Sequence, residues 1–212
     1  MATAVLGTRL MLLGWAWAGI ATLVIALALW VALLRPVLAE WKSPTVGVSL
    51  LLAVSFESLA VLAATVAASQ PARWLLIAAL VPFGLGLGFY VFVISRFDVH
   101  QLAVGRGDHW ITGGALGISA LAAARIAAGA RALGIAGVRG GALEDIAIVL
   151  WVLTMLWLLV LLLAEVRWPR LSIGPGRWST VFPLGMYAAS SLAVGVVLGR
   201  GSPNAGTPAL TT

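Results

Sequence analysis

Six long apolar stretches constrain the fold of this sequence more than any other feature. They cover residues 10–34, 46–68, 74–95, 109–128, 146–164 and 178–198. Each is close to the roughly 20 residues that an α-helix needs to cross the hydrocarbon core of a bilayer. Only 9% of the 212 residues are charged, whereas a soluble domain carries about 25%. The sequence therefore predicts an all-α integral membrane protein, a helical bundle with about six transmembrane helices.

The connections between these stretches are too short to form a soluble domain, so residues 1–200 are predicted to be a single transmembrane domain. Arg9 ahead of the first stretch resembles the start of a signal sequence. The roughly 25 uncharged residues that follow it exceed the 7–15 of a signal peptide, and we expect a retained helix. The tail, residues 201–212, is rich in Gly, Pro and Thr and is predicted to be disordered.

The basic residues indicate an orientation in the membrane. Loops after the first, third and fifth stretches hold seven Lys and Arg residues, and the opposite side holds five. Because positive charge favours the cytoplasmic side, the sequence predicts a multi-pass protein of the cell (plasma) membrane with both termini outside the cytoplasm. The pI of about 11.3 reflects scarce acids and arginines at helix ends, and we expect no nucleic-acid partner.

Several kinds of chemistry are excluded or disfavoured. The sequence has no cysteine, which excludes disulfides, zinc–thiolate sites and cysteine nucleophiles. His100 and His109 are too few for a metal site, and the glycines of "FGLGLG" lack the lysine of a phosphate-binding loop. Ser119 in "GISA" has no activating base in its sequence neighbourhood. We therefore expect no metal, no cofactor and no enzymatic activity.

The six stretches alternate in side-chain size. The first, third and fifth are rich in bulky residues, as in "LWVLTMLWLLVLLLA", whereas the second, fourth and sixth are rich in Gly, Ala, Ser and Thr, as in "HWITGGALGISALAAA". Small residues let helix backbones approach closely inside a membrane bundle, and bulky residues can face lipid. The alternation predicts three hairpins, each with one outer and one inner helix, and mutual packing of the three inner helices.

Glu57 is the only charge in the second stretch. At 100° per residue it shares a helix face with Ala53, Ala60 and Ala64, so its carboxylate is predicted to point into the bundle. A charge at the bilayer centre costs roughly 2.5–3.5 kcal/mol on insertion scales. We therefore expect a partner that compensates this charge.

Arg125, the only charge in the fourth stretch, is the predicted partner. It lies about five residues further along its stretch than Glu57 does, an offset of roughly 7–8 Å, which an arginine side chain can bridge. The pair is interpreted either as a charge site on a permeation path or as a buried pair that only fixes helix packing. Two alternatives stay open. Glu57 is neutral or bonded to a hydroxyl such as Ser119 or Ser190, or Arg125 extends to the membrane interface.

Three motifs are specific enough to suggest a protein family. They are "SLAVLAA" at residues 58–64, "DHWITGGALGISALAA" at residues 108–123 and "RWSTVFPLGMYAASSLAVG" at residues 177–195. In order and spacing they resemble the fifth, seventh and ninth helices of the tellurite-resistance/dicarboxylate transporter family, which includes the slow anion channels of plants. The "WSxVFPLGMY" motif is the most specific of the three.

The resemblance implies an architecture and a path. The family has ten helices in five hairpins, and its odd-numbered inner helices surround a pore for small anions or for monocarboxylic and dicarboxylic acids. This chain would correspond to helices four to nine, with its second, fourth and sixth stretches lining the pore. In the channels a phenylalanine of the ninth helix occludes the pore, and the matching residue is Phe182, followed by Pro183. Without the resemblance, packing beside a proline kink is the simpler interpretation of Phe182.

The sequence also departs from the family pattern. Phe56 and Glu57 replace a polar pair, and Ser119–Ala120 replaces Ser-Thr. Four of the ten helices have no predicted counterpart, and three inner helices cannot close a ring of five. The chain is then a truncated or degenerate member, or it completes its pore by association, for instance as a homo-oligomer.

The sequence supports two alternative functions. The first is a membrane permease or channel-like protein for small anionic substrates. Its candidate transport-pathway residues are Glu57, Ser119, Arg125, Phe182 and Pro183. The alternative is a non-transporting membrane fragment or accessory subunit that keeps only the packing of the family.

Overall fold

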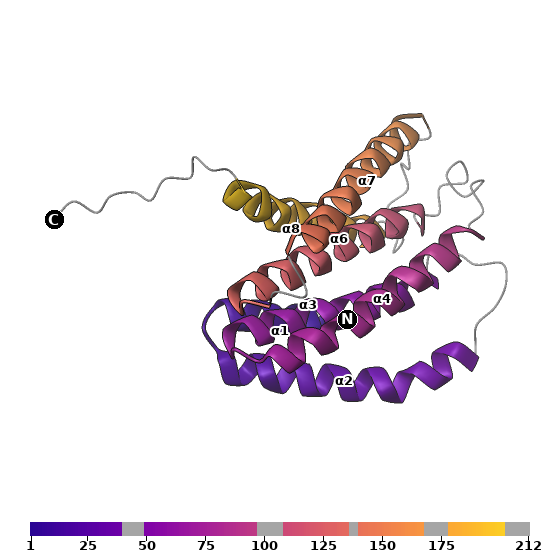
Figure 1. Ribbon diagram of the computed structural model, residues 1–212. Coiled ribbons are helices and arrows are strands. Elements are labelled where there is room, and N and C mark those ends of the chain that lie inside the picture. Colours follow the sequence, from indigo (N-terminus) through magenta and orange to yellow (C-terminus); the bar gives the residue numbers. More distant parts are fainter. Residues whose placement is uncertain (40–48, 97–107, 136–139, 168–177, 202–212) are drawn as a thin grey trace.

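The computed structural model describes residues 1–39, 49–96, 108–135, 140–167 and 178–201. Within these ranges the chain forms seven α-helices and no strand (Figure 1). The helices are α1 (Ala2–Leu12), α2 (Ala16–Ala39), α3 (Leu50–Ser69), α4 (Arg73–Ile94), α6 (Asp108–Ala132), α7 (Gly140–Arg167) and α8 (Trp178–Gly201). All except α1 are long and apolar enough to cross a membrane. The predicted helical membrane bundle with six spans is confirmed.

The first predicted span is wrong in its bounds. The apolar run from residue 10 to residue 34 is divided between α1 and α2, because the backbone turns at Gly14, whose φ of +84° suits glycine better than any residue with a Cβ. Four of the remaining five spans agree with the predicted ranges to within four residues at each end, and α7 begins six residues before its predicted start. Of the predicted tail, residue 201 ends α8, and residues 202–212 lie outside the described part of the chain.

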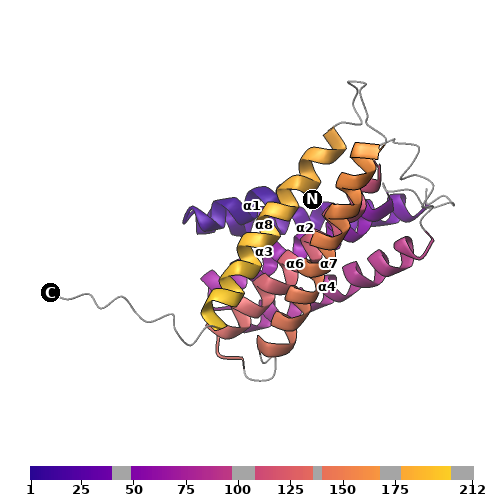
Figure 2. The ribbon, with the colours of Figure 1, turned by 90° about the horizontal axis from the view of Figure 1, so that it is seen from above.

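The helices pair as hairpins in chain order. α1 packs on α2, α3 on α4, and α6 on α7, while α8 packs on α6 and to a smaller extent on α7. Figure 2 shows α7 and α8 side by side across the bundle, with α6 adjacent to both. In each hairpin the first helix also contacts the first helix of a neighbouring hairpin, α1 against α3 and α3 against α6. The inner helices therefore follow one another in the order α1, α3, α6, α8.

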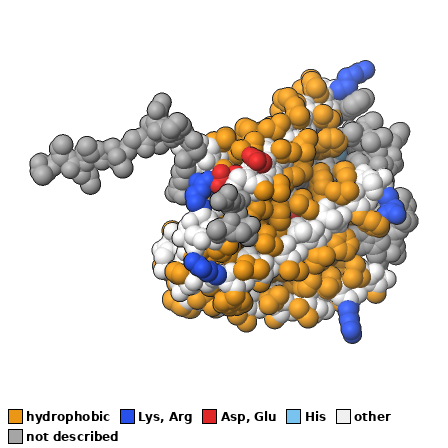
Figure 3. Space-filling view, viewed as in Figure 1, with side chains coloured by type: hydrophobic (Ala, Val, Ile, Leu, Met, Phe, Trp, Pro, Cys, Tyr) orange, Lys and Arg blue, Asp and Glu red, His pale blue; other side chains and the backbone are white. Residues whose placement is uncertain are grey.

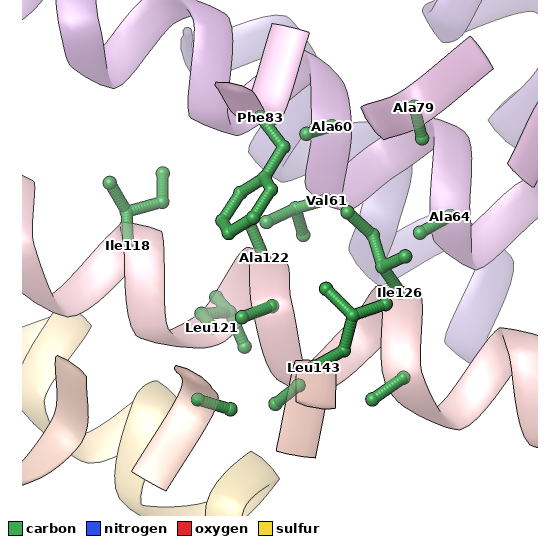
Figure 4. Close-up of a cluster of buried hydrophobic side chains, with 14 of the residues drawn as sticks. Ala60, Val61, Ala64, Ala79, Phe83, Ile118, Leu121, Ala122, Ile126 and Leu143 are labelled. Carbon is green, nitrogen blue, oxygen red and sulfur yellow. The ribbon is translucent and has the colours of Figure 1, made fainter. Parts of the chain in front are cut away.

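Small residues explain why α3 and α6 lie at the centre. Alanine-rich faces of both helices meet, and in the apolar stretch of each 89% of the residues are buried. Figure 4 shows side chains of α3, α4 and α6 converging in this core. On the opposite side of α6, Gly113 and Gly114 meet side chains of α7 and α8 at distances that leave little room for a Cβ. Glycine and alanine thus allow α6 to pack against three helices at once.

The predicted mutual packing of the three inner helices is found between α3 and α6 and between α6 and α8, but α8 does not pack substantially on α3 and is much less enclosed than the other two. Only 28% of the residues in its apolar stretch are buried, close to the 17–22% of the outer helices α2, α4 and α7. One side of α8 rests on α6, and the other carries large exposed side chains such as Leu184, which is 50% exposed. Small residues on α8 therefore allow close packing without dictating that the helix is enclosed.

The surface fits a lipid environment. Large apolar side chains of α2, α4 and α7 are exposed along their whole length, as Figure 3 shows for one face, where hydrophobic side chains dominate and Lys and Arg side chains lie toward the margins. A soluble monomer rarely exposes a contiguous apolar area of this extent. The chain is a multi-pass membrane protein that sits in a lipid bilayer.

Candidate functional site

The inner helices line a cavity of about 250 Å³ that is open on one side, where the lining residues Leu12, Leu192 and Val196 are exposed. Five residues of α1 between Ala4 and Leu12 line it, together with five of α6 between Ile118 and Ala128 and five of α8 between Met186 and Val196. α3 contributes Ser58 and Val61. On α1, α6 and α8 these residues recur every three or four positions, so each helix presents one stripe to the cavity. The cavity therefore lies among the helices that the resemblance assigns to the pore, with α1 added to them.

Two arginines, Arg9 of α1 and Arg125 of α6, supply the charge of this cavity. No acidic residue is among the described residues that line it, and neither arginine forms an ion pair in the described part of the chain, where Arg131 and Glu144 are the one pair found. The Nε atom of Arg125 is buried and has no hydrogen-bond partner among the described groups. The cavity is thus positively charged and has no fixed counter-charge.

The two arginines stand at a similar depth in the bundle. A Cβ on Gly7, two residues before Arg9, would lie 3.0 Å from Leu62 of α3. A Cβ on Gly129, four residues after Arg125, would lie 3.6 Å from the backbone oxygen of Ala64, also on α3. Leu62 is seven residues before the end of α3 at Ser69, or roughly 10 Å at about 1.5 Å per residue. Arg125 therefore lies inside the transmembrane region, and Arg9, which is exposed, lies at a similar level beside the cavity.

The two hydroxyl groups of the cavity wall bond to their own helices. Thr8 donates to the carbonyl oxygen of Ala4 at 2.9 Å, and Ser58 donates to that of Ser55 at 2.9 Å. Such bonds to the preceding turn occupy the hydroxyl proton. The guanidinium groups are therefore the donors that remain available to a negatively charged molecule in the cavity.

The predicted ion pair between Glu57 and Arg125 is wrong. Glu57 is completely buried, but its Oε1 atom lies 3.0 Å from the hydroxyl oxygen of Ser119 on α6, and no salt bridge joins it to Arg125. Ser119 and Arg125 are six residues apart, which separates them by about 120° around α6 and by roughly 9 Å along it. The face of α6 that reaches Glu57 is therefore not the face that carries Arg125. The alternative of a hydroxyl partner for Glu57 is the one that the structure bears out.

The surroundings of Glu57 fit a neutral, protonated carboxyl group. The hydroxyl of Ser119 lies within hydrogen-bonding distance of Glu57 and also of the Ala115 carbonyl oxygen, at 3.1 Å. A serine has one proton to donate, so donation to Ala115 leaves its oxygen free to accept the proton of Glu57. The second carboxyl oxygen, Oε2, has no partner among the described groups. An ionised carboxylate left in this way would cost several kcal/mol.

Glycine on α4 makes room for this carboxyl group. A Cβ on Gly86 would lie 2.8 Å from Glu57 Oε1, whereas Gly84 and Gly88 have nothing within 4 Å. Phe56, the other residue that departs from the family pattern, stacks on Phe89 of α4 at 5.4 Å and meets Trp30 of α2 edge-on at 4.8 Å. Phe56 and Glu57 therefore join α3 to its neighbours on the side away from the cavity.

Phe182 and Pro183 lie at the contact between α6 and α8. A Cβ on Gly114 would lie 3.1 Å from the Cα and Cγ atoms of Pro183, so the two helices cross closely here. Phe182 is partly buried against the hydrophobic core and does not line the cavity. It precedes Met186, the first cavity-lining residue of α8, by one turn and shares its face. Phe182 is thus placed next to one end of the cavity.

Sequence reasoning missed Arg9 as a member of the site. It assigned Arg9 to the end of a long first helix, because the apolar run begins at residue 10. The signal that was available is the spacing of Gly7, Met11 and Ala4 on one face with Thr8 and Arg9 beside it, within an eleven-residue helix. In the described part of the chain, no group of three or more His, Asp or Glu side chains could hold a metal ion.

Comparison with known proteins gives one informative result. The sequence matches the family described as voltage-dependent anion channel over residues 1–207. Curated protein sequences and solved structures give no match. Because the family match covers nearly all of the 212 residues, the chain belongs to the voltage-dependent anion channel family, a family of membrane channels and transporters rather than enzymes.

Proposed function

We propose that the chain carries small anions across the membrane and that their path runs through the cavity between α1, α3, α6 and α8. The observation that supports this most is the side chain of Arg125, which faces the cavity at membrane depth without an acidic partner. A charge placed there is costly, and ionisable residues inside membranes commonly mark ion pathways. A mobile anion is the counter-charge that the described protein groups do not supply.

The candidate residues take different parts in this proposal. Arg125 attracts the anion, and Phe182, next to the end of the cavity, restricts its passage. Pro183 fixes the crossing of α8 over α6 at Gly114. Glu57 and Ser119 do not line the cavity, so they shape its wall by holding α3 against α6 rather than by contacting the anion. Carboxylic acids, including dicarboxylates, and inorganic anions such as tellurite are the substrates that the family resemblance suggests.

The cellular setting is part of the proposal. The excess of basic residues in the loops after α2, α4 and α7 supports a plasma-membrane protein with those loops in the cytoplasm and both termini outside it. The large exposed face of α8 also leaves room for a second copy of the chain or for lipid.

The same exposed face favours a second candidate function, that of a non-transporting subunit. α8 is enclosed on one side only, so the described helices line the cavity without surrounding it completely. In this case the chain retains the packing of α3 and α6 but forms no continuous path.

Reconstitution distinguishes the two. The purified chain in liposomes should move radiolabelled nitrate or succinate down a gradient, and Arg125→Gln should reduce this flux to near the background of empty liposomes. Arg131→Gln, which changes an exposed arginine outside the cavity, serves as the matched control and should keep the flux. A folded chain without flux for either anion would support the non-transporting subunit.

A further inference from the structure

The short helix α1 packs against its neighbours and also brings a charged residue to the cavity. One face of it is buried against α2 and α3 through Ala4, Gly7 and Met11. The adjacent face, with Val5, Thr8, Arg9 and Leu12 at positions i, i+3, i+4 and i+7, lines the cavity. Gly7 fits so closely against Thr22 and Leu62 that a Cβ would collide with them. α1 is therefore held in a fixed rotation, and that rotation places Arg9, an exposed side chain, at the open side of the cavity.

Arg9 and Arg125 consequently belong to one electrostatic unit. They come from different helices, line the same cavity and lie near enough for their charges to act on one another. The two guanidinium groups carry like charges and repel one another. Among the described lining residues no carboxylate offsets them. One anion with a single charge would neutralise only half of the unit.

We propose that Arg9 and Arg125 bind one doubly charged anion between them and that Arg9 determines the preference for divalent over monovalent anions. The inference rests on the proposed function, because it specifies the anion that enters the same path. Guanidinium groups suit oxyanions in particular, since each presents a planar fork of donors to a pair of oxygen atoms. The cavity of about 250 Å³ far exceeds the share of about 30 Å³ that one water takes in the liquid. A dianion with part of its hydration therefore fits.

Arg9→Gln in the full-length chain tests this assignment, with sulfate as the divalent probe and nitrate as the monovalent one. In liposomes the wild-type chain should take up sulfate in preference to nitrate. Arg9→Gln should lower sulfate flux by roughly tenfold or more, the usual size for loss of one charge-assisted contact, and should change nitrate flux much less. Arg9→Lys keeps the charge and should retain most of the preference. Arg131→Gln, outside the cavity, should behave as wild type.

A binding measurement separates this inference from the proposed function. Sulfate titrated into the detergent-solubilised chain should raise its melting temperature at lower concentrations than nitrate does, and Arg9→Gln should remove that difference. Nitrate flux without any preference for sulfate, or equal losses for both anions in Arg9→Gln, would overturn the two-arginine site and leave anion transport standing. Absence of all flux would contradict the proposed function, and sulfate-specific stabilisation that depends on Arg9 would still support the site. If neither sulfate nor Arg9 affects the melting temperature of a chain without flux, both proposals fail.

Discussion

Replacing Glu57 by glutamine tests how a carboxyl group exists at the centre of this membrane bundle. The side chain is completely buried, it bonds to the hydroxyl of Ser119, and it forms no salt bridge with another residue that the structure describes. Glutamine has nearly the same shape, and its amide can donate to Ser119 while Ser119 donates to Ala115. The substitution therefore reproduces the hydrogen bonds of a protonated carboxyl group, and we expect the free energy of unfolding to change by less than about 1 kcal/mol.

The opposite assumption, that Glu57 is ionised, predicts a much larger change in the free energy of unfolding. If Glu57 were ionised and paired with Arg125, removing one partner would leave a buried charge, at a cost of about 3–5 kcal/mol. For a chain of 150–250 residues, 1 kcal/mol shifts the melting temperature by about 2–4 °C. The paired model thus predicts a loss of roughly 6–20 °C, whereas the neutral model predicts a shift of at most a few degrees.

Thermal unfolding of the chain in detergent, followed by tryptophan fluorescence, measures this difference. Glu57→Ala is the control for sensitivity, because it leaves a void beside Gly86 and should cost about 2–5 kcal/mol, as buried large-to-small changes do. Ser119→Ala should cost about 1 kcal/mol, and little more when combined with Glu57→Gln. A large loss in Glu57→Gln that the additional change Arg125→Gln restores would refute the neutral carboxyl group and reinstate the ion pair.

Three further changes test the packing and the path. Gly86→Ala should destabilise the chain by about 1–3 kcal/mol in the same unfolding measurement, because its Cβ would meet Glu57. Gly84→Ala, with open space around it, is the control and should be neutral or stabilising. Equal effects of the two substitutions would show that the close contact between Gly86 and Glu57 is unimportant. Gly114→Ala should push α8 away from α6 and lower the liposome flux, and an unchanged flux would separate this crossing from the path. Phe182→Ala should raise anion flux, since it removes a side chain next to one end of the cavity, and an unchanged flux in a transporting chain would leave packing as its role.

The parts of the fold that could be predicted follow from solvent and side-chain size. Apolar length gives the spans, since every backbone polar group in lipid must be paired within a helix. The alanine-rich face around Glu57 correctly predicts that α3 is central. Side-chain size does not predict the burial of α8, because small residues permit close packing on one side of a helix and say nothing about what covers the other side. The length of the apolar run does not predict the bounds of the first span, because the backbone turns at Gly14, which has a positive φ, and divides a run that is continuous in composition.

The contacts within the site were harder to predict, because they depend on the rotation of each helix about its own axis. Matching Glu57 with Arg125 depended on depth alone, and rotation about the helix axis decides the contact. Ser119 and Arg125 project from different faces of α6, so one meets α3 and the other meets the cavity. Arg9 escaped prediction because the spacing of Ala4, Gly7 and Met11 indicates a buried face of α1 but not the helices that this face meets. That partner is decided by a tertiary contact, the packing of Gly7 against Thr22 and Leu62.

The arrangement of charged residues explains why a bundle with so few of them carries Glu57 and Arg125 near its centre and Arg9 at the open side of its cavity. Glu57 and the arginines lie on opposite sides of the wall that α3 and α6 form, the carboxyl group among buried side chains and the guanidinium groups at the cavity. If Glu57 faced the cavity, it would neutralise an arginine and remove the attraction for an anion. Placed behind the wall and kept neutral, it joins the helices without opposing the positive field. The cost of burying Arg125 is then offset only when an anion is present, so occupancy of the cavity should stabilise the same inner-helix packing that shapes it.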